Sequence, residues 1–289
     1  MKLSKGPEPQ PFEVAGRLSG ETVGEGPAVV LCHGITATRH QLLHGSQALP
    51  RAGYEVITFD ARGHGESEPA PEGSGYGYPE LVSDLEAVVA ETVGEKPFVL
   101  GGHSWGSQVA AAYALEQPDR LAGLIEIGPV YAGPIEDQEA IRSLQAHWDE
   151  RADGLEQGGV DGFLEVIDRQ GLDPDWRDTI LRFTRERMLL HRHPEAVAEA
   201  MREVSRTKPF DSMDELEFLD VPALVVASHD VADPGHPRDV AEAYAQRLPN
   251  SRLISEAEGE SPLAWQGGRL SREIASFVAE PPVVERLRG

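Results

Sequence analysis

A serine flanked by glycines is the strongest sign of chemistry in this sequence. Ser104 has Gly102 two residues before it and Gly106 two residues after it. The apolar run KPFVL precedes this group and the Ala-rich run SQVAAAYAL follows it, which predicts a strand, a sharp turn and a helix in succession. At the apex of such a turn the serine takes a positive φ, and side chains two residues away on either side would collide. The spacing therefore predicts an exposed, nucleophilic hydroxyl.

The residue after the serine contributes a main-chain N–H to the same turn. Trp105 would begin the following helix, where unpaired N–H groups and the helix dipole favour an anion. An N–H there can stabilise the oxyanion that forms when Ser104 attacks a carbonyl carbon. Because glycine makes up 30 of the 289 residues, the spacing alone also fits an ordinary glycine-rich turn between a strand and a helix.

The charge and the composition exclude several classes of protein. Asp and Glu number 49 against 26 Lys and Arg, and the formal net charge is −23. Such a charge repels phosphate backbones and anionic lipid surfaces, so we expect no nucleic acid and no membrane as partners. The single cysteine, Cys32, has no partner for an internal disulfide, and no stretch approaches the ~18 uninterrupted apolar residues of a membrane span. We predict a cytoplasmic protein.

Six apolar runs of strand length alternate with amphipathic helical patterns. The runs cover residues 27–34, 54–60, 97–102, 121–128, 221–228 and 251–256. The helical patterns cover residues 81–93, 236–247 and 268–279. Continuous hydrophobicity is typical of strands that are buried on both faces. The alternation therefore predicts an α/β fold with a mostly parallel, doubly wound sheet.

The alternation stops between about residues 131 and 212. Four helical segments divided by Gly and Pro fill this stretch, without a strand pattern among them. We expect a core domain of residues 1–130 and 213–289 and a helical insertion of residues 131–212. The insertion should cover the carboxyl ends of the strands, where open α/β sheets bind ligands. Four aromatic side chains of the insertion fit either a pocket lining over the serine or a buried core: Trp148, Phe163, Trp176 and Phe183.

Four motifs, in this order, resemble those of the α/β-hydrolase family, and the resemblance covers roughly residues 12–280. They are LCHGITAT, DARGHGES at residues 60–67, GGHSWG around Ser104, and VPALVVASHDVADP, in which an aspartate precedes a proline by four residues. The resemblance implies the α/β-hydrolase fold, with a helical cap inserted after the sixth strand.

The resemblance assigns roles to the first half of the site. Ser104 would be the nucleophile, and the Trp105 main-chain N–H would be one oxyanion donor. The second donor would be the main-chain N–H of Ile35, which follows His33 and Gly34. Each donor of this kind contributes about 3 to 4 kcal/mol to transition-state stabilisation. No metal and no organic cofactor is implied, and the sequence contains no phosphate-binding loop and no metal-ligand spacing.

The second half of the site departs from the family. The acid would be Asp230, which ends a buried strand and precedes Pro234 by four residues; Asp233 is the weaker choice, and Asp230 also fits an ordinary turn aspartate. The family's catalytic histidine is missing, because the matching segment EAEGESPLAWQGG has Glu260 in its place, and no histidine follows His236. Loss of the histidine alone from a serine triad lowers kcat about a millionfold.

Three explanations of the missing histidine remain open. Glu260 can be the base, although a carboxylate is a weaker base than imidazole and Asp230 cannot orient it, since both groups only accept hydrogen bonds. His236 can be the base, because its place just before Pro237 suits the first turn of a helix, which favours a neutral imidazole; it also fits a surface loop. The weaker candidates are the motif histidines His33, His64 and His103. The third explanation is that no base remains.

The sequence therefore predicts a serine hydrolase-like enzyme that cleaves a small carboxylic ester or a related acyl compound through an acyl-enzyme on Ser104. Hydrolysis of an amide, a lactone or a carbon–carbon bond would use the same turn. The alternative is a non-catalytic protein that binds or senses a small molecule on the same scaffold, because function depends on the site and the expected base is absent.

Overall fold

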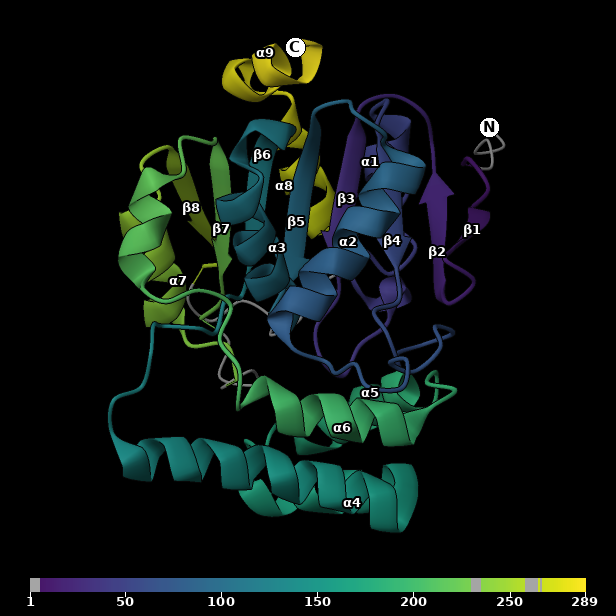
Figure 1. Ribbon diagram of the computed structural model, residues 1–289, viewed down its shortest axis with the longest axis vertical. Helices are drawn as coiled ribbons and strands as arrows, with labels where there is room; N and C mark the ends of the chain where they lie inside the picture. The colour runs from purple at the N-terminus through teal and green to yellow at the C-terminus, as the bar shows by residue number, and fades with distance from the viewer. Residues whose placement is uncertain (1–5, 230–234, 258–264, 266) are drawn as a thin grey trace.

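One mixed β-sheet forms the centre of the molecule (Figure 1). The computed structural model describes residues 6–229, 235–257, 265 and 267–289. Within these residues the sheet has eight strands in the order β1-β2-β4-β3-β5-β6-β7-β8. The strands are β1 (Gln10–Val14), β2 (Leu18–Val23), β3 (Ala28–Cys32), β4 (Glu55–Phe59), β5 (Phe98–His103), β6 (Leu121–Ile127), β7 (Ala223–Ala227) and β8 (Ser251–Ser255).

The strands from β3 to β8 run parallel to one another, as the sequence predicts, and each overlaps one of the six apolar runs. The sequence does not predict β1 and β2, which pair antiparallel with each other, while β2 pairs antiparallel with β4. The strand β1 is largely exposed, so it lacks the continuous hydrophobicity that marks the buried strands. The four central strands β3, β4, β5 and β6 are buried almost throughout.

Helices cover both faces of the sheet and form two separate apolar cores. One face packs against α2 (Tyr78–Thr92), α3 (Trp105–Glu116) and α7 (Arg238–Arg247). The other face packs against α1 (Ala48–Arg51), α8 (Gly268–Val278) and α9 (Pro281–Arg288). Short 3-10 helices cover Arg39–Gln41, Pro118–Arg120 and Met213–Phe218. The predicted helices at 81–93, 236–247 and 268–279 are present as α2, α7 and α8, whereas α9 was not predicted.

The chain between β6 and β7 forms the helical cap that the sequence predicts. It contains α4 (Gln138–Gln170), α5 (Arg177–Met188) and α6 (Pro194–Val204), which lie beyond the carboxyl ends of the strands (Figure 1). Gly159, with φ 60° and ψ −150°, divides α4 into the two helices expected from the sequence. The two helices of α4 pack closely against each other. A Cβ added to Gly154 would lie only 2.8 Å from the carbonyl oxygen of Gly162.

The cap aromatics differ in their surroundings. Phe163 is fully buried in the core that also contains α2 and α3, which agrees with the core alternative rather than the pocket lining. Trp148 packs against the same core and is partly buried. The contact between the cap and the core also includes a hydrogen bond. The main-chain N–H of Tyr76 in the core donates to the carboxylate of Glu203 in α6 at 2.6 Å. The cap is therefore attached to the core by apolar packing and by hydrogen bonds.

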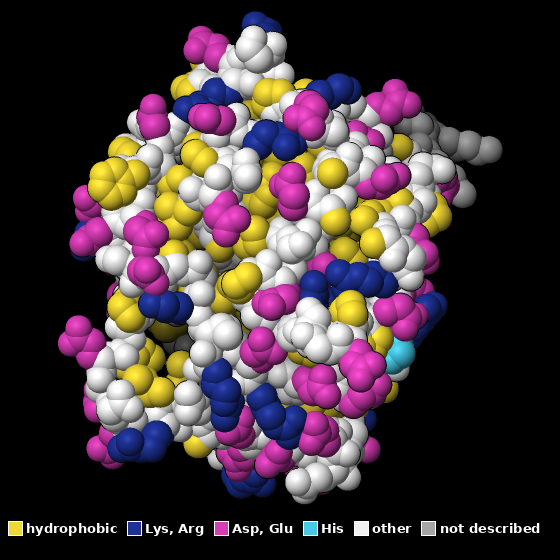
Figure 2. Space-filling model, viewed as in Figure 1, with side chains coloured by type: hydrophobic (Ala, Val, Ile, Leu, Met, Phe, Trp, Pro, Cys, Tyr) yellow, Lys and Arg dark blue, Asp and Glu magenta, His cyan; other side chains and the backbone are white. Residues whose placement is uncertain are grey.

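The surface reflects the acidic composition. Asp and Glu side chains spread over the whole visible face, with Lys and Arg among them (Figure 2). This distribution agrees with a solvated acidic surface. In the described part of the chain, no helix combines the length and the hydrophobicity that a membrane crossing needs.

Candidate active site

The predicted turn between β5 and α3 is present, and Ser104 occupies its apex. Ser104 has φ 56° and ψ −119°, and of the described residues other than glycine only Ala15 and His44 share a positive φ. The main-chain N–H of Ser104 donates to Ile127 of β6 at 2.9 Å. Its carbonyl oxygen accepts from the Ser107 hydroxyl at 2.7 Å. These bonds hold a backbone conformation that costs about 1 to 3 kcal/mol elsewhere in a protein.

The two glycines around Ser104 are required by close backbone contacts. A Cβ on Gly102 would overlap the carbonyl group of Gly106, and a Cβ on Gly106 would overlap the carbonyl oxygens of Cys32 and His33. Each obstacle is backbone, which cannot move aside without shifting a strand or a helix. The collision across the bend that the sequence predicts is present at Gly102, whereas Gly106 is restricted by the carboxyl end of β3.

The loop after β3 lies against this turn. A Cβ added to Gly34 would lie 3.3 Å from the Cβ atom of Ser104. Ile35 and Trp105, the predicted oxyanion donors, are 6% and 2% exposed. Neither of their main-chain N–H groups donates to another atom of the described residues. The loop after β3 and the turn at Ser104 are therefore in close contact, and the two predicted donors lie on these two segments.

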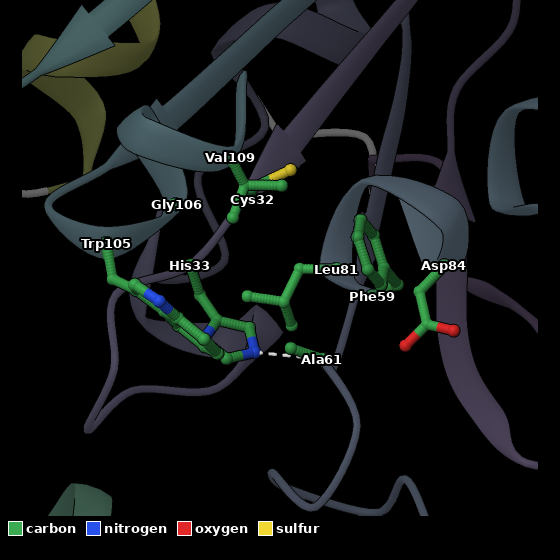
Figure 3. Close-up of a pocket in the computed structure, with 9 residues that line it drawn as sticks. All are labelled: Cys32, His33, Phe59, Ala61, Leu81, Asp84, Trp105, Gly106 and Val109. Carbon is green, nitrogen blue, oxygen red and sulfur yellow. Dashed lines mark hydrogen bonds between the residues drawn. The ribbon is translucent and has the colours of Figure 1, made fainter. Parts of the chain in front are cut away.

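The motif histidines near the turn are held as neutral rings. His33 donates to the carbonyl oxygen of Gly34 at 2.8 Å and accepts from the Ala61 N–H at 2.9 Å (Figure 3). Burial, together with the neighbouring His64, lowers the pKa of His33 to about 3. Burial also lowers the pKa of His64, whose two ring nitrogens face main-chain carbonyl groups. Neither ring is available to take the proton of Ser104, so both remain weak candidates for the base.

The small cavity next to Trp105 is not a substrate pocket. It has a volume of about 20 Å³ and is lined by Cys32, His33, Phe59, Ala61, Leu81, Asp84, Trp105, Gly106 and Val109 (Figure 3). This space holds about one water molecule. None of the four cap aromatics lines it.

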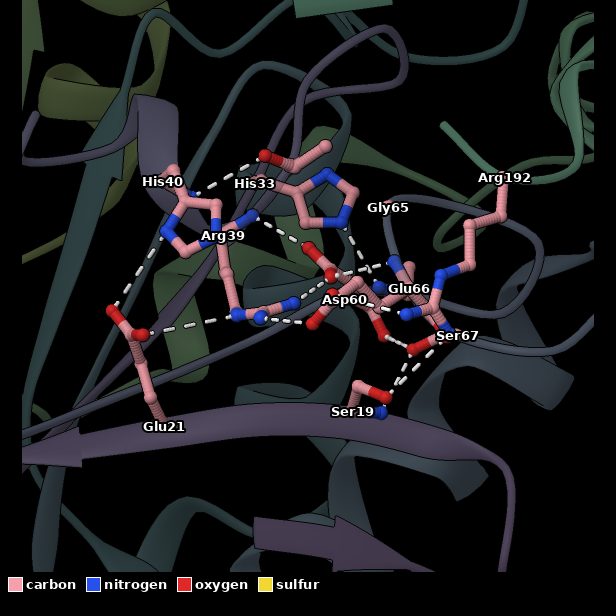
Figure 4. Close-up of polar contacts among 12 residues, drawn as sticks. Ser19, Glu21, His33, Arg39, His40, Asp60, Gly65, Glu66, Ser67 and Arg192 are labelled. Carbon is pink, nitrogen blue, oxygen red and sulfur yellow. Dashed lines mark hydrogen bonds and ion pairs between the residues drawn. The ribbon is translucent and has the colours of Figure 1, made fainter. Parts of the chain in front are cut away.

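The second motif, DARGHGES, is organised around a buried carboxylate. Asp60 is fully buried and accepts the main-chain N–H groups of Arg39 at 2.8 Å and Glu66 at 3.0 Å (Figure 4). The Arg39 guanidinium also pairs with Asp60, which offsets the cost of burying its charge. Gly65 has φ 51°, and a Cβ there would overlap the Asp60 carboxylate. Asp60 therefore fixes the turn that carries His64.

The predicted acid and the residue in the histidine position lie outside the described residues: Asp230, Asp233 and Glu260. Ser228, His229 and Trp265, which lie close to these positions in the sequence, all donate to another carboxylate, that of Glu256. Glu256 directly follows β8, is 4% exposed, and accepts from the Ser228 hydroxyl at 2.7 Å and from Trp265 Nε1 at 2.9 Å.

The main-chain N–H of His229 is the third donor to Glu256. Burial alone would raise the pKa of Glu256, but the hydrogen bonds from Ser228, His229 and Trp265 hold it below its ordinary value. The ionised carboxylate thus joins the ends of β7 and β8. The local sequence offers one signal for this group, a glutamate that directly follows an apolar run.

His236 lies beside the turn. Its ring centroid is 4.8 Å from that of His103, the residue before Ser104. A Cβ on Gly128, at the end of β6, would lie 3.2 Å from His236 Cδ2. The expectation that His236 occupies the first turn of a helix is wrong, because α7 starts at Arg238 and Pro237 is its N-cap. The chain folds this imidazole back onto the carboxyl ends of β5 and β6.

Comparison with known proteins establishes the family. The family model for the alpha/beta hydrolase fold matches residues 27–267, and the chain belongs to that family. Together with the sheet order and the cap after β6, this match confirms the resemblance in fold.

Individual relatives cover only part of the chain. Epoxide hydrolase B of Mycobacterium tuberculosis is 39% identical over 109 residues, which are 38% of this chain and 30% of that protein. The sn-1-specific diacylglycerol lipase of Mus musculus is 35% identical over 111 residues, which are 37% of this chain and 35% of the lipase. The match therefore spans about a third of each relative. A thermophilic esterase from Thermogutta terrifontis shares the fold with a TM-score of 0.72 and 23% identity, over 98% of this chain and 100% of the esterase.

Proposed function

We propose that this protein is a serine hydrolase that cleaves a small carboxylic ester or a related acyl compound. The observation that carries the proposal is the strained conformation of Ser104 at φ 56°, held beside the loop that contains Ile35. A backbone strain of this kind persists only where the surrounding structure enforces it, and it is concentrated at functional sites.

The proposed reaction has two chemical steps. The Ser104 hydroxyl attacks the carbonyl carbon, and the main-chain N–H groups of Ile35 and Trp105 donate to the oxyanion that results. The leaving group departs, and an acyl-enzyme on Ser104 remains. Water then attacks the same carbonyl carbon through a second oxyanion and releases the acid. Each step needs a base that removes a proton from the attacking oxygen.

The chemistry of a serine favours acyl compounds over epoxides, although epoxide hydrolases are among the relatives. Attack of a serine hydroxyl on an epoxide carbon forms an ether. An ether has no carbonyl carbon for water to attack, so the enzyme would not be regenerated. An ester formed from Ser104 returns the free hydroxyl on hydrolysis.

Two residues are candidates for the base in this proposal. His236 is supported by the contact between its ring and that of His103, next to the nucleophile, and by the suitability of imidazole for proton transfer near neutral pH. Glu260 is supported by its place in the sequence, where the family has the histidine, with Asp230 as the proposed acid. Either choice predicts an enzyme that is slow compared with a complete serine triad.

A second function is favoured by one observation, the absence of any histidine after His236. If no base operates, the scaffold binds or senses a small molecule beneath its cap without turning it over.

The test is hydrolysis of p-nitrophenyl acetate and butyrate by the natural protein and by Ser104→Ala, His236→Ala and Glu260→Ala. We expect slow turnover that disappears in Ser104→Ala and falls in the variant that removes the base. Ser83→Ala, an exposed serine on α2, and His40→Ala, a half-exposed histidine, are the matched controls and should leave the rate unchanged. A rate that is equal in the natural protein and in Ser104→Ala would favour the binding protein. Styrene oxide should not be turned over.

A further inference from the structure

A histidine of the cap reaches the loop that follows β3. His191 lies between α5 and α6 and is 8% exposed. Its Nδ1 accepts a hydrogen bond from the main-chain N–H of Gly65 at 3.0 Å, and its Nε2 lies 3.2 Å from the carbonyl oxygen of Thr36. One side chain of the cap thus joins two motif loops of the core.

The partners determine the protonation of this ring. The Gly65 N–H can only donate, so Nδ1 carries no proton, and Nε2 carries the proton that is donated to Thr36. Burial, with a further contribution from the neighbouring His64, lowers the pKa of His191 to about 3. The ring therefore stays neutral across the ordinary pH range, and the two hydrogen bonds persist in one tautomer.

The main chain of the cap strengthens this contact. The N–H of Arg192 donates to the carbonyl oxygen of Gly65 at 2.9 Å, so the cap engages both polar groups of that glycine. The Arg192 guanidinium also lies 3.2 Å from the carboxylate of Glu66 (Figure 4). The contact between residues 191–192 of the cap and residues 65–66 of the core therefore consists of several polar interactions and not of one side chain alone.

A second histidine holds the neighbouring carbonyl group of the same loop. His64 Nε2 lies 2.8 Å from the carbonyl oxygen of Ile35. The ring of His64 meets that of His191 edge-on at 5.4 Å and lies 5.3 Å from the ring of Trp105. One histidine from the core and one from the cap thus lie within hydrogen-bonding distance of two consecutive carbonyl groups.

Both of these carbonyl groups, those of Ile35 and Thr36, follow the proposed oxyanion donor in the chain. The Ile35 N–H belongs to the peptide that joins it to Gly34, and the Gly34 carbonyl oxygen accepts from the Ala37 N–H at 2.9 Å and from His33 at 2.8 Å. With the carbonyl groups before and after it held, this N–H has little freedom to rotate. Loss of the bond to Thr36 removes a hydrogen bond between this turn and the cap.

We propose that His191 is a positioning residue through which the docked cap fixes the turn of residues 34–37 and, with it, the direction of the Ile35 N–H. Its catalytic consequence rests on the function proposed above, whereas its effect on the turn does not. Activity would then depend on the seating of the cap, even though His191 does not contact the reacting atoms.

Three substitutions separate this role from simple space filling. His191→Phe keeps a ring but removes both hydrogen bonds. His191→Gln places an amide where Nε2 lies and can still donate to Thr36, whereas His191→Asn places a polar atom near Nδ1 and cannot reach Thr36. His193→Phe is the matched control, because His193 of the cap lies 3.6 Å from the carboxylate of Glu68 in the core and, among the described residues, has no hydrogen bond to the turn.

The first readout is hydrogen exchange at individual amides, measured by NMR. The Ala37 N–H reports on the turn, because it donates to Gly34 across it. We expect its exchange to be about tenfold faster or more in His191→Phe and His191→Asn, and near the natural rate in His191→Gln and His193→Phe.

The second readout is ester hydrolysis. A misplaced donor costs less than the 10²- to 10³-fold that follows the removal of one, so we expect kcat to fall about 10- to 100-fold in His191→Phe. KM should change less than about threefold, because the donor acts on the transition state. His191→Gln should recover most of kcat.

The outcomes are distinct. An unchanged Ala37 exchange rate in a folded His191→Phe overturns the inference, and so does a rise in KM at constant kcat. If His191→Phe does not fold, the comparison of His191→Gln with His191→Asn decides in the same way. If the natural protein shows no turnover that depends on Ser104, the proposed function fails, and the Ala37 exchange rate alone decides whether His191 holds the turn.

Discussion

The two halves of the sheet's carboxyl edge are built in different ways. At β3 and β5 the backbone itself forms the site: Gly34 packs against Ser104, and Gly102 and Gly106 admit no side chain. At β7 and β8 side chains connect the strand ends, because Ser228 and Trp265 donate hydrogen bonds to the carboxylate of Glu256. In the function proposed above, the first half would stabilise the oxyanion, and the second half would contain the proton-transfer residue, for which the sequence has Glu260 in place of the family's histidine.

If the proposed function holds, the difference means that charge stabilisation and proton transfer depend on separate parts of this fold. The first depends on backbone contacts between consecutive motifs and survives as long as the turn can form. The second depends on single side chains that follow β7 and β8. A chain can therefore keep the first function while the second is changed by one substitution.

The largest effect on activity is expected from introducing a histidine at the position where the family has its catalytic base. Glu260→His should raise kcat/KM for p-nitrophenyl butyrate about 100-fold or more, because a triad histidine contributes about a millionfold to kcat. Glu258→His, which introduces the same side chain two residues earlier, is the control and should have no such effect. If the two variants behave alike, position 260 does not converge with Ser104.

The next largest effect is a loss of stability when a side chain is added at the turn between β5 and α3. Gly106→Ala should destabilise the protein by about 3 kcal/mol or more, because the new methyl group meets the carbonyl oxygens of Cys32 and His33. Gly158→Ala is the matched control, since a Cβ there meets nothing within 4 Å. Urea unfolding measures both. Equal midpoints would mean that the turn tolerates a side chain and is not the rigid element described above.

A smaller loss of stability is expected when a hydrogen bond at the ends of β7 and β8 is removed. Trp265→Phe removes one donor from the buried Glu256 carboxylate and should cost about 1 to 3 kcal/mol at pH 7. The pKa of Glu256 is lowered in the folded protein, so its contribution is present above the ordinary value of 4.5 and is lost as the pH falls through the lower, folded value. The difference between the variant and the natural protein, measured by urea unfolding, should therefore shrink in acid. A difference that persists unchanged in acid would show that packing, not the hydrogen bond, is responsible.

The smallest effect contrasts Glu256 with a second buried carboxyl, that of Glu126 in β6. Burial raises the pKa of Glu126 well above its ordinary value, and neither carboxyl oxygen has a hydrogen-bond partner among the described residues. The stability it contributes is complete below 4.5 and is lost as the pH rises towards the folded value.

Glu126→Gln removes this titration and keeps the shape. The variant should be about 1 kcal/mol more stable than the natural protein at pH 8 and no more stable at pH 4, as measured by urea unfolding. A variant that is less stable at both pH values would mean that the carboxyl is needed in its present form.

Much of the fold is readable from local signals. The buried strands β3 to β8 are continuous apolar runs, and the turn at Ser104 follows from glycine spacing. The half-exposed strands β1 and β2 lack such a run and were missed. The contacts of His191 with Gly65 and of Glu256 with Trp265 were also missed, since they join segments that the topology, not the local sequence, brings together. The place of His236 against His103 is of the same kind.

The central claim, that the turn presents Ser104 as an acylating nucleophile, has a direct test. Both attacks need a base, but p-nitrophenolate is a much better leaving group than the serine alkoxide of the acyl-enzyme, so deacylation is the slower step and the acyl-enzyme accumulates. Mass spectrometry of the protein after incubation with p-nitrophenyl butyrate should show one butyryl group on the peptide that contains Ser104, and none in Ser104→Ala. Absence of this adduct in the natural protein, or the same modification in Ser104→Ala, would contradict the account.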